Sequence, residues 1–119
     1  EGCVAGAVCF VGSWNSGQQD YDWQISNTVF VPRKQSTRGL VELTISELVG
    51  GGLLLMMWGS NTGLDPLDCP PRKWFSLSED GGFTWSPVSD IRYDNGDQLY
   101  SPASIFRVIR STKTGKLYL

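Results

Sequence analysis

The chain has 119 residues, with ten basic and twelve acidic side chains, a formal net charge of −2 and no histidine. This length suits one small domain, and hydrophobic and charged fractions of 40% and 18% are typical of a globular chain rather than a disordered one. Because no dense basic patch exists, nucleic acid is not expected as a partner. The lack of histidine excludes Ser-His-Asp catalysis, Cys-His nucleophiles and histidine metal ligands within this segment.

Membrane insertion and metal binding are not expected either. The longest apolar run, residues 53–58, is far too short to span a bilayer. Cys3, Cys9 and Cys69 do not have the spacing of a zinc site. We therefore expect buried free thiols, no metal and no cofactor.

Short runs rich in Val, Ile, Leu, Trp and Phe recur along the chain, separated by 14 glycines and 6 prolines. This pattern predicts strands and turns without helices. In chain order, the predicted strands are residues 4–11, 23–31, 40–48, 53–59, 72–78, 84–92, 101–109 and 116–119. The fold class is therefore all-β.

The stretch 78–85, Ser-Glu-Asp-Gly-Gly-Phe-Thr-Trp, carries the most information. A short acceptor such as Asp80 bonds nearby backbone N–H groups and holds a tight turn, while the two glycines permit positive φ. Thr84 and Trp85 begin the next strand, and the indole is expected to pack back under the turn. The stretch thus predicts a hairpin connection, and Asp80 is not expected to be catalytic or to bind metal.

A degenerate copy of this stretch occurs in the first half, as Ser13-x-Asn15-x-Gly17 followed by Trp23. Repeated units of four strands, joined by turns, are typical of propeller blades. Two such units cannot close a ring of about four to eight blades. An apolar start and a strand just beginning at 116–119 agree with this, so we expect the chain to be a fragment of a larger protein.

The five fixed positions of the pattern S-x-D-x-G-x-T-W are occupied by Ser78, Asp80, Gly82, Thr84 and Trp85. The octet resembles the Asp-box, or BNR repeat, of sialidases and related β-propellers, where it lies on the rim, away from the active site. The resemblance implies a sialidase-type β-propeller, six-bladed in the whole protein, with about two four-stranded antiparallel blades here. Residues 1–39 would end one blade, 40–92 would form a complete blade, and 101–119 would start the next.

A second segment, from Glu42 to Trp58, is similar to a segment of sialidases. From Glu42 to Trp58 the chain resembles their segment E-x-x-x-V-E-L-x-x-G-x-L-L-M-x-x-R without a gap. In that family the first glutamate faces the central cleft and pairs with a nucleophilic tyrosine, and the arginine belongs to the cluster that binds the substrate carboxylate. Glu42 occupies the glutamate position, whereas Trp58 stands where the arginine is expected.

The chemistry explains why the family needs such groups. Sialic acid carries a carboxylate on its anomeric carbon, which guanidinium groups bind through bidentate hydrogen bonds. Sialidases use a tyrosine nucleophile, and a phenol with a pKa near ~10 needs a carboxylate as general base. An indole in place of a guanidinium removes a charged partner worth about 1.5–3 kcal/mol. Trp58 therefore either lines an altered sugar subsite or fills the core, and Glu42 is either a site residue or a solvent-exposed strand residue.

Two arginines are further candidates for substrate binding. Arg107 closes the stretch 101–107, which is similar to an S-P-A-S-I-x-R stretch at the start of sialidase-like blades. It either points toward the cleft or is a surface charge. Arg72 precedes the Asp-box strand and is a possible substitute cation. The candidate site thus comprises Glu42 as the catalytic residue, with Trp58, Arg107 and Arg72 as binding residues.

The resemblance implies an exo-α-sialidase that hydrolyses terminal sialic acid from glycoconjugates, with Glu42 activating a tyrosine supplied elsewhere. The partners would be a sialylated or other glycan and the remaining blades of the same chain, and this segment alone would be inactive. Two alternatives stay open: a propeller glycosidase for another sugar, and a non-catalytic Asp-box propeller that binds glycans or proteins. Secretion or a periplasmic location is expected of the whole protein. Alone, the chain is expected to be poorly soluble or oligomeric.

Overall fold

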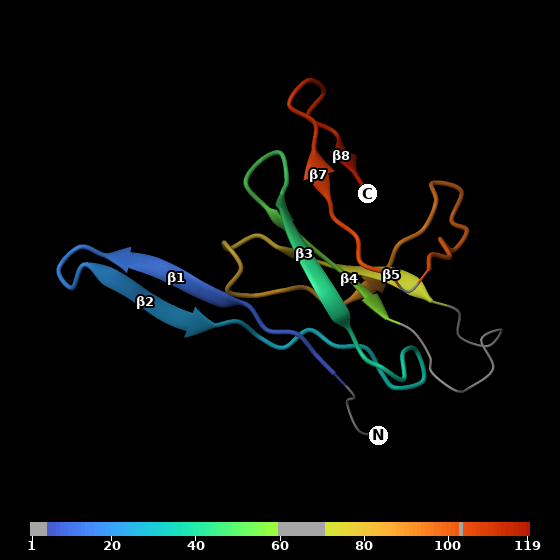
Figure 1. Cartoon of the computed structure of the whole chain (residues 1–119), viewed down its shortest axis with the longest axis horizontal. Coiled ribbons are helices and arrows are strands. Elements are labelled where there is room, and N and C mark those ends of the chain that lie inside the picture. Colours follow the sequence, from blue (N-terminus) through green and yellow to red (C-terminus); the bar gives the residue numbers. More distant parts are fainter. Residues whose placement is uncertain (1–4, 60–70, 103) are drawn as a thin grey trace.

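The computed structural model describes residues 5–59, 71–102 and 104–119. These residues contain eight strands and no helix (Figure 1). The strands form one four-stranded sheet and two two-stranded sheets, and every pairing is antiparallel. The predicted all-β fold is confirmed.

The four-stranded sheet consists of β3 (Val41–Glu47), β4 (Leu53–Gly59), β5 (Arg72–Ser78) and β6 (Ser89–Asp90). Each strand pairs with the next one along the chain, so the sheet is a simple meander. The predicted ranges 53–59 and 72–78 are confirmed. Both strands are specified locally, because an apolar run begins after a glycine turn and the second strand ends at a turn motif.

The two smaller sheets are hairpins that project from the four-stranded sheet (Figure 1). One joins β1 (Phe10–Asn15) to β2 (Asp20–Ile25), and the other joins β7 (Ile109–Arg110) to β8 (Leu117–Tyr118). The chain measures 55 × 40 × 21 Å and has a radius of gyration of 16.0 Å. A compact domain of this length would have a radius of about 13.5 Å. The structure is thus a sheet with extended arms.

Several predicted strand boundaries are wrong, and in the first half the cause is a side chain. Within the range 4–11, β1 begins only at Phe10, and β2 ends at Ile25 rather than continuing to residue 31. Beyond Ile25, the hydroxyl of Ser26 accepts the hydrogen bond of the Cys9 N–H at 2.9 Å. This side-chain bond replaces one of the two backbone bonds between these residues, whereas the Ser26 N–H still donates to the Cys9 carbonyl at 2.9 Å. Beyond this point only an isolated bridge between Ala7 and Val29 continues the pairing.

Two further predicted strands are shorter than expected. The range 84–92 contains only β6, Ser89–Asp90, and in the range 101–109 strand β7 starts only at Ile109. Trp85 bonds a side chain rather than a strand, and Pro87 has no N–H to donate. In the range 101–109, the carbonyls of Pro102 and Ser104 accept hydrogen bonds from the ammonium group of Lys73 instead of from a neighbouring strand. Only one four-stranded sheet therefore forms among the described residues, and not two.

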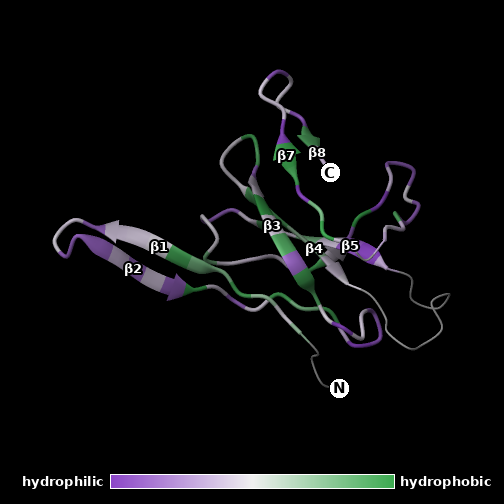
Figure 2. Cartoon of the chain, viewed as in Figure 1, coloured by the Kyte–Doolittle hydropathy of each residue, from purple (hydrophilic) through white to green (hydrophobic). Residues whose placement is uncertain are grey.

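The main core lies between one face of the sheet and residues 5–31. Residues 5–31 form one long ribbon, whose outer half is the β1–β2 hairpin and whose inner half crosses the sheet (Figure 1). The buried hydrophobic residues of this core are Ala7, Val29, Val31, Leu40, Leu55, Met57, Trp74 and Trp85. Hydrophobic colour accordingly gathers on β3, β4 and the chain beside them (Figure 2).

The opposite face of the sheet is covered by residues 104–110. Val108 is buried there, and its carbonyl accepts a hydrogen bond of 3.3 Å from the Ser46 hydroxyl of β3. The Arg110 guanidinium reaches the carbonyl of Glu47. The second half of β4 is thus packed on both faces, which explains why all residues from Leu55 to Gly59 are buried.

Candidate functional site

Glu42 has an unusual backbone conformation for a strand residue. The register of β3 against β4 shifts between Val41 and Thr44, and within this bulge Glu42 has a φ of +51°. A positive φ at a residue other than glycine costs about 1–3 kcal/mol and occurs preferentially at functional sites. Bulges also redirect side chains away from the regular alternation of a strand. The carboxylate of Glu42 is therefore aimed by a local distortion.

Trp58 holds this carboxylate in place. Its side chain lies between Val41 of β3 and Lys73 of β5 in the sheet register and is only 4% exposed. The indole Nε1–H donates a hydrogen bond to Oε2 of Glu42. The guanidinium carbon of Arg38 lies 5.1 Å from the centre of the same indole ring, within the range of a cation–π interaction. One buried tryptophan thus positions both the carboxylate of Glu42 and the guanidinium of Arg38.

Lys73 is a buried cation beside this group. It is 2% exposed, and its Nζ donates hydrogen bonds to the carbonyls of Pro102 at 3.2 Å and Ser104 at 2.9 Å. The ammonium also lies 4.4 Å from the centre of the Phe106 ring. Burial lowers the pKa of Lys73, and the negative charge of Glu42 partly opposes that shift. Lys73 therefore anchors the segment that covers the sheet and adds positive potential near Glu42.

Glu42, Trp58 and Arg38, which we call the Glu42 cluster, form an exposed polar site on a rigid base. Glu42 and Arg38 are exposed, whereas Trp58 is buried. A carboxylate with one oxygen held by a donor keeps its second oxygen as a proton acceptor. A guanidinium nearby offers planar N–H donors to an anion. The cluster combines a positioned base with an anion-binding group.

The structure brings two of the four predicted site residues together, namely Glu42 and Trp58. Trp58 is buried, which agrees with its interpretation as a core residue and leaves its ring face to Arg38 rather than to a ligand. Arg72 is turned toward β6. Its guanidinium lies 3.6 Å from the Asp90 carboxylate and 6.0 Å from the Tyr100 ring centre.

Arg107 is not directed toward the Glu42 cluster. In the segment that covers the sheet, Phe106 and Val108 are the more buried positions, whereas Ile105 and Arg107 are exposed. Because these positions alternate, Arg107 lies on the side facing away from the sheet. The arrangement favours its interpretation as a surface charge.

The Asp-box forms a compact hydrogen-bonded turn between β5 and β6. Asp80 Oδ1 accepts hydrogen bonds from the Ser78 hydroxyl at 2.8 Å and the Thr84 N–H at 2.9 Å, and Oδ2 accepts one of 2.5 Å from the Thr84 hydroxyl. The Ser78 hydroxyl in turn accepts the Gly82 N–H at 2.9 Å. The bonds from Thr84 and Ser78 lower the pKa of the Asp80 carboxyl to about 2.

This turn lies at the opposite end of the sheet from the Glu42 cluster. Ser78 pairs with Leu53 at the start of β4, whereas Trp58 lies near its end. The Trp85 side chain is buried, and a Cβ placed on Gly82 would lie 3.6 Å from its ring. A glycine with a φ of +97° thus lets the turn close over the indole. All five residues of the motif have structural partners, and the turn is not part of the candidate site.

Sequence reasoning missed three residues that organise the structure: Arg38, Lys73 and Asn27. Arg38 lies in a loop, and nothing in its neighbourhood marks it as a partner of Trp58. Lys73 lies between Arg72 and Trp74 near the start of β5, so two adjacent basic residues gave no sign that this lysine is buried. The Asn27 side chain accepts the Trp85 N–H at 2.7 Å and donates to the Trp85 carbonyl at 3.0 Å. It mimics a strand neighbour across 58 residues of sequence.

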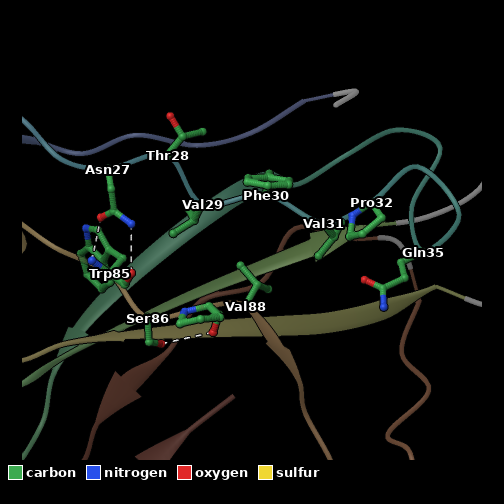
Figure 3. A pocket seen from close by; sticks show the side chains of 11 residues that line it. Asn27, Thr28, Val29, Phe30, Val31, Pro32, Gln35, Trp85, Ser86 and Val88 are labelled. Atoms are coloured by element: carbon green, nitrogen blue, oxygen red, sulfur yellow. Dashed lines mark hydrogen bonds between the residues drawn. The ribbon is translucent and has the colours of Figure 1, made fainter. Parts of the chain in front are cut away.

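A cleft of about 400 Å³ lies between the ribbon and the chain after the Asp-box (Figure 3). Asn27 and Trp85 lie at one end, and Val29, Val31 and Val88 point into it. None of its eleven lining residues is titratable. The cleft offers no acid–base chemistry, which leaves the Glu42 cluster as the candidate site.

Other site types find no counterpart in residues 5–59, 71–102 and 104–119. No group of three His, Cys, Asp or Glu side chains is placed to hold a metal ion there. The same residues contain no helix with the length and apolar character needed to cross a bilayer. Cys9 is a half-buried free thiol, and burial raises its pKa. Cys3 and Cys69 lie outside the described residues.

No protein-family model, curated protein or solved structure matches this sequence.

Proposed function

We propose that this chain forms part of the catalytic propeller of a sialidase-type glycoside hydrolase, in which Glu42 is the general base for a tyrosine nucleophile. The observation that carries the proposal is the conformation of Glu42. An exposed glutamate is held at positive φ inside a bulge, with one carboxylate oxygen fixed by a buried indole. Strain of this kind persists where the surrounding structure imposes it, and it is concentrated at functional sites.

The carboxylate has the properties that such a base needs. Trp58 engages Oε2 of Glu42, so Oε1 is the oxygen that would take the phenolic proton. The indole is rigid because β3 and β5 flank it in the sheet. A fixed base loses less conformational freedom when it reacts, and orientation is a large part of catalysis.

Arg38 fits the second requirement of a sialidase, which is a cation for the substrate carboxylate. The resemblance to sialidases expects an arginine where this chain has Trp58. Arg38 lies over the Trp58 ring, so a guanidinium occupies nearly the same region although it comes from another part of the chain. The Arg38 guanidinium therefore supplies the positive charge that is lost where Trp58 replaces the expected arginine. A positive charge at this place favours a sugar acid over a neutral sugar as the substrate.

The propeller part of the proposal has its own support. The described residues contain a four-stranded antiparallel meander whose second strand is buried from Leu55 to Gly59, and an Asp-box turn joins its third and fourth strands. Blades of β-propellers are four-stranded meanders that pack face to face. Glu42 and Trp58 of the cluster lie on the first two strands, at the end away from the Asp-box, and Arg38 lies in the loop before β3.

The test is hydrolysis of a fluorogenic α-sialoside by the full-length protein and by its Glu42→Gln variant. Loss of a general base should lower kcat by roughly 10²–10⁴-fold. Glu47→Gln is the matched control, because Glu47 is also exposed on β3 but lies at the opposite end of the strand. Equal activity of Glu42→Gln and the wild type would refute the role of Glu42.

Substrate choice separates the remaining alternatives. In a sialidase, Arg38→Lys should raise KM for the sialoside, because lysine loses the bidentate fork. If the folded full-length protein hydrolyses a neutral glycoside and no sialoside, another sugar is the substrate. If it hydrolyses neither, the propeller is a binding module.

A further inference from the structure

Lys73 lies directly beside Trp58, the tryptophan that holds the carboxylate of the Glu42 cluster. The two residues are opposite each other in the register of β4 and β5, so their side chains point to the same face of the sheet. The next pair in this register, Met57 and Trp74, points to the other face and belongs to the main core. Lys73 and the Glu42 cluster therefore share the face of the sheet that lies away from the ribbon.

Among the residues that the structure describes, the ammonium group of Lys73 has no carboxylate in direct contact. Only 2% of the residue is exposed, and its Nζ donates hydrogen bonds to the carbonyls of Pro102 at 3.2 Å and Ser104 at 2.9 Å. Both acceptors are neutral, so they satisfy N–H donors but leave the positive charge unbalanced. A buried charge of this kind needs an opposite charge close by, because it has lost its hydration.

Glu42 supplies that opposite charge. Burial lowers the pKa of Lys73, and the negative charge of Glu42 opposes this shift, so the two charges interact. Such an interaction is reciprocal, and the ammonium group favours the ionised form of the carboxylate by the same free energy. Two cations of the described chain thus face Glu42: Lys73 from β5, and Arg38 from the loop before β3.

We propose that Lys73 is a positioning residue of the candidate site, whose ammonium group keeps Glu42 ionised and holds the segment that covers the sheet in place beside it. The first role follows from the charge. The second follows from the hydrogen bonds to Pro102 and Ser104 and from the distance of 4.4 Å between Nζ and the centre of the Phe106 ring. This inference rests on the proposed function, in which Glu42 has to be ionised before it can accept the phenolic proton.

The kinetic test is the pH dependence of kcat for hydrolysis of an α-sialoside by the full-length protein and by its Lys73→Gln variant. Glutamine carries an N–H donor for the carbonyls but no charge. The acidic limb of the profile should move to higher pH by about one pH unit, because no ammonium group then opposes protonation of Glu42. Below that limb kcat should fall about tenfold, and well above it the two rates should differ by less than about threefold.

Two further variants separate the charge of Lys73 from its packing. Lys73→Arg keeps a positive charge at this place, so the acidic limb should stay where it is in the wild type. Phe106→Leu removes the ring beside the ammonium group but not the charge, and it should also leave the limb in place. A limb that moves equally in Lys73→Gln and Phe106→Leu, or a loss of kcat by one constant factor at every pH, would overturn the role of the charge.

A second measurement needs no turnover and no change at Lys73, so it also applies if Lys73→Gln does not fold. In the full-length protein with isotope-labelled lysine, the NMR signal of the Lys73 ε-carbon reports the protonation of the ammonium group. Glu42→Gln removes the charge of an exposed side chain, so the pKa of Lys73 should fall further. Glu47→Gln is the matched control, because Glu47 is also exposed on β3 but lies at its opposite end.

The two measurements distinguish failure of this inference from failure of the proposed function. A pKa of Lys73 that is the same in the wild type and in Glu42→Gln would overturn the inference, whatever the activity. A wild type that hydrolyses no sialoside, but whose Lys73 signal responds to Glu42→Gln and not to Glu47→Gln, would refute the sialidase and support the link between Lys73 and Glu42.

Discussion

The four-stranded sheet and the β1–β2 hairpin consist of similar residues but differ in burial. β4 contains Leu, Met and Trp, and its last five residues are all buried. The hairpin contains Phe, Trp, Tyr and Ile, and no residue of β1 or β2 is buried. The sheet has the ribbon on one face and residues 104–110 on the other, whereas the exposed aromatic side of the β1–β2 hairpin has no layer over it among the described residues. Apolar strands become a core only where the fold supplies a layer for each face.

The two turns make the same comparison on a smaller scale. Asp80 and Asn15 both accept backbone N–H groups in a hairpin connection, Asn15 from Gly17 at 3.0 Å and Gln18 at 3.3 Å. Trp85, which follows the Asp80 turn, is 5% exposed, whereas Trp23, which follows the Asn15 turn, is 62% exposed. Similar turn chemistry therefore does not determine whether the next aromatic residue is buried.

The largest effect should come from a matched pair of aliphatic truncations. Leu55→Ala removes a side chain that is 0% exposed and should lower the free energy of unfolding by about 2–5 kcal/mol, through lost burial and a cavity. Ile25→Ala removes one that is 64% exposed and should change it by about 0.5 kcal/mol or less. Urea unfolding at low protein concentration, where association does not contribute, measures both. Equal losses would mean that the hairpin shares the core of the sheet.

A smaller effect should follow when the contact between ribbon and sheet is cut. Asn27→Ala leaves the N–H and carbonyl of Trp85 without their partners, which should cost about 1–3 kcal/mol. Asn15→Ala is the control, because water can replace its exposed bonds, and it should cost about 0.5 kcal/mol or less. If urea unfolding finds the two variants equally stable, Asn27 does not join the two regions.

The smallest effect should be a pH dependence confined to the Asp-box turn. The pKa of Asp80 is about 2 in the folded chain and about 3.9 in an unfolded one. The unfolded state therefore binds more protons in this window, so stability should be lost as the pH falls from about 4 to about 2. Asp80→Asn should flatten this part of the profile of urea midpoint against pH, whereas Asn15→Ala should not. A profile unchanged by Asp80→Asn would contradict the assigned hydrogen bonds.

Prediction from sequence succeeded where the chain specifies its own ends. β4 and β5 were predicted at both boundaries, and a glycine turn before β4 and the Asp-box after β5 explain two of these four ends. The predicted strand 101–109 was wrong because the carbonyls of Pro102 and Ser104 accept hydrogen bonds from Lys73. Lys73 is 29 residues from Pro102 and 31 from Ser104 in the sequence. A strand continues only while a neighbour offers backbone groups, and that neighbour cannot be read from local pattern.

The candidate site was only partly predictable for the same reason. Glu42 and Trp58 were singled out by their place in one segment, and they form a hydrogen bond. Arg72 and Arg107 were selected by proximity to strands, but ion pairing and side-chain alternation direct them elsewhere. Arg38 belongs to the cluster only because its loop folds over Trp58. Cation–π contacts of this kind have no signature in sequence.

By itself, the sequence determined the all-β class, the two central strands and the hydrogen-bonded turn of Asp80, because alternation, glycine and short acceptor side chains act within a few residues. Only the tertiary structure decided which apolar faces are buried, where the edge strands end, and which cation accompanies Glu42. Those outcomes depend on contacts between segments distant in the chain, where a single side chain such as Asn27 or Lys73 replaces a whole strand as the hydrogen-bond partner.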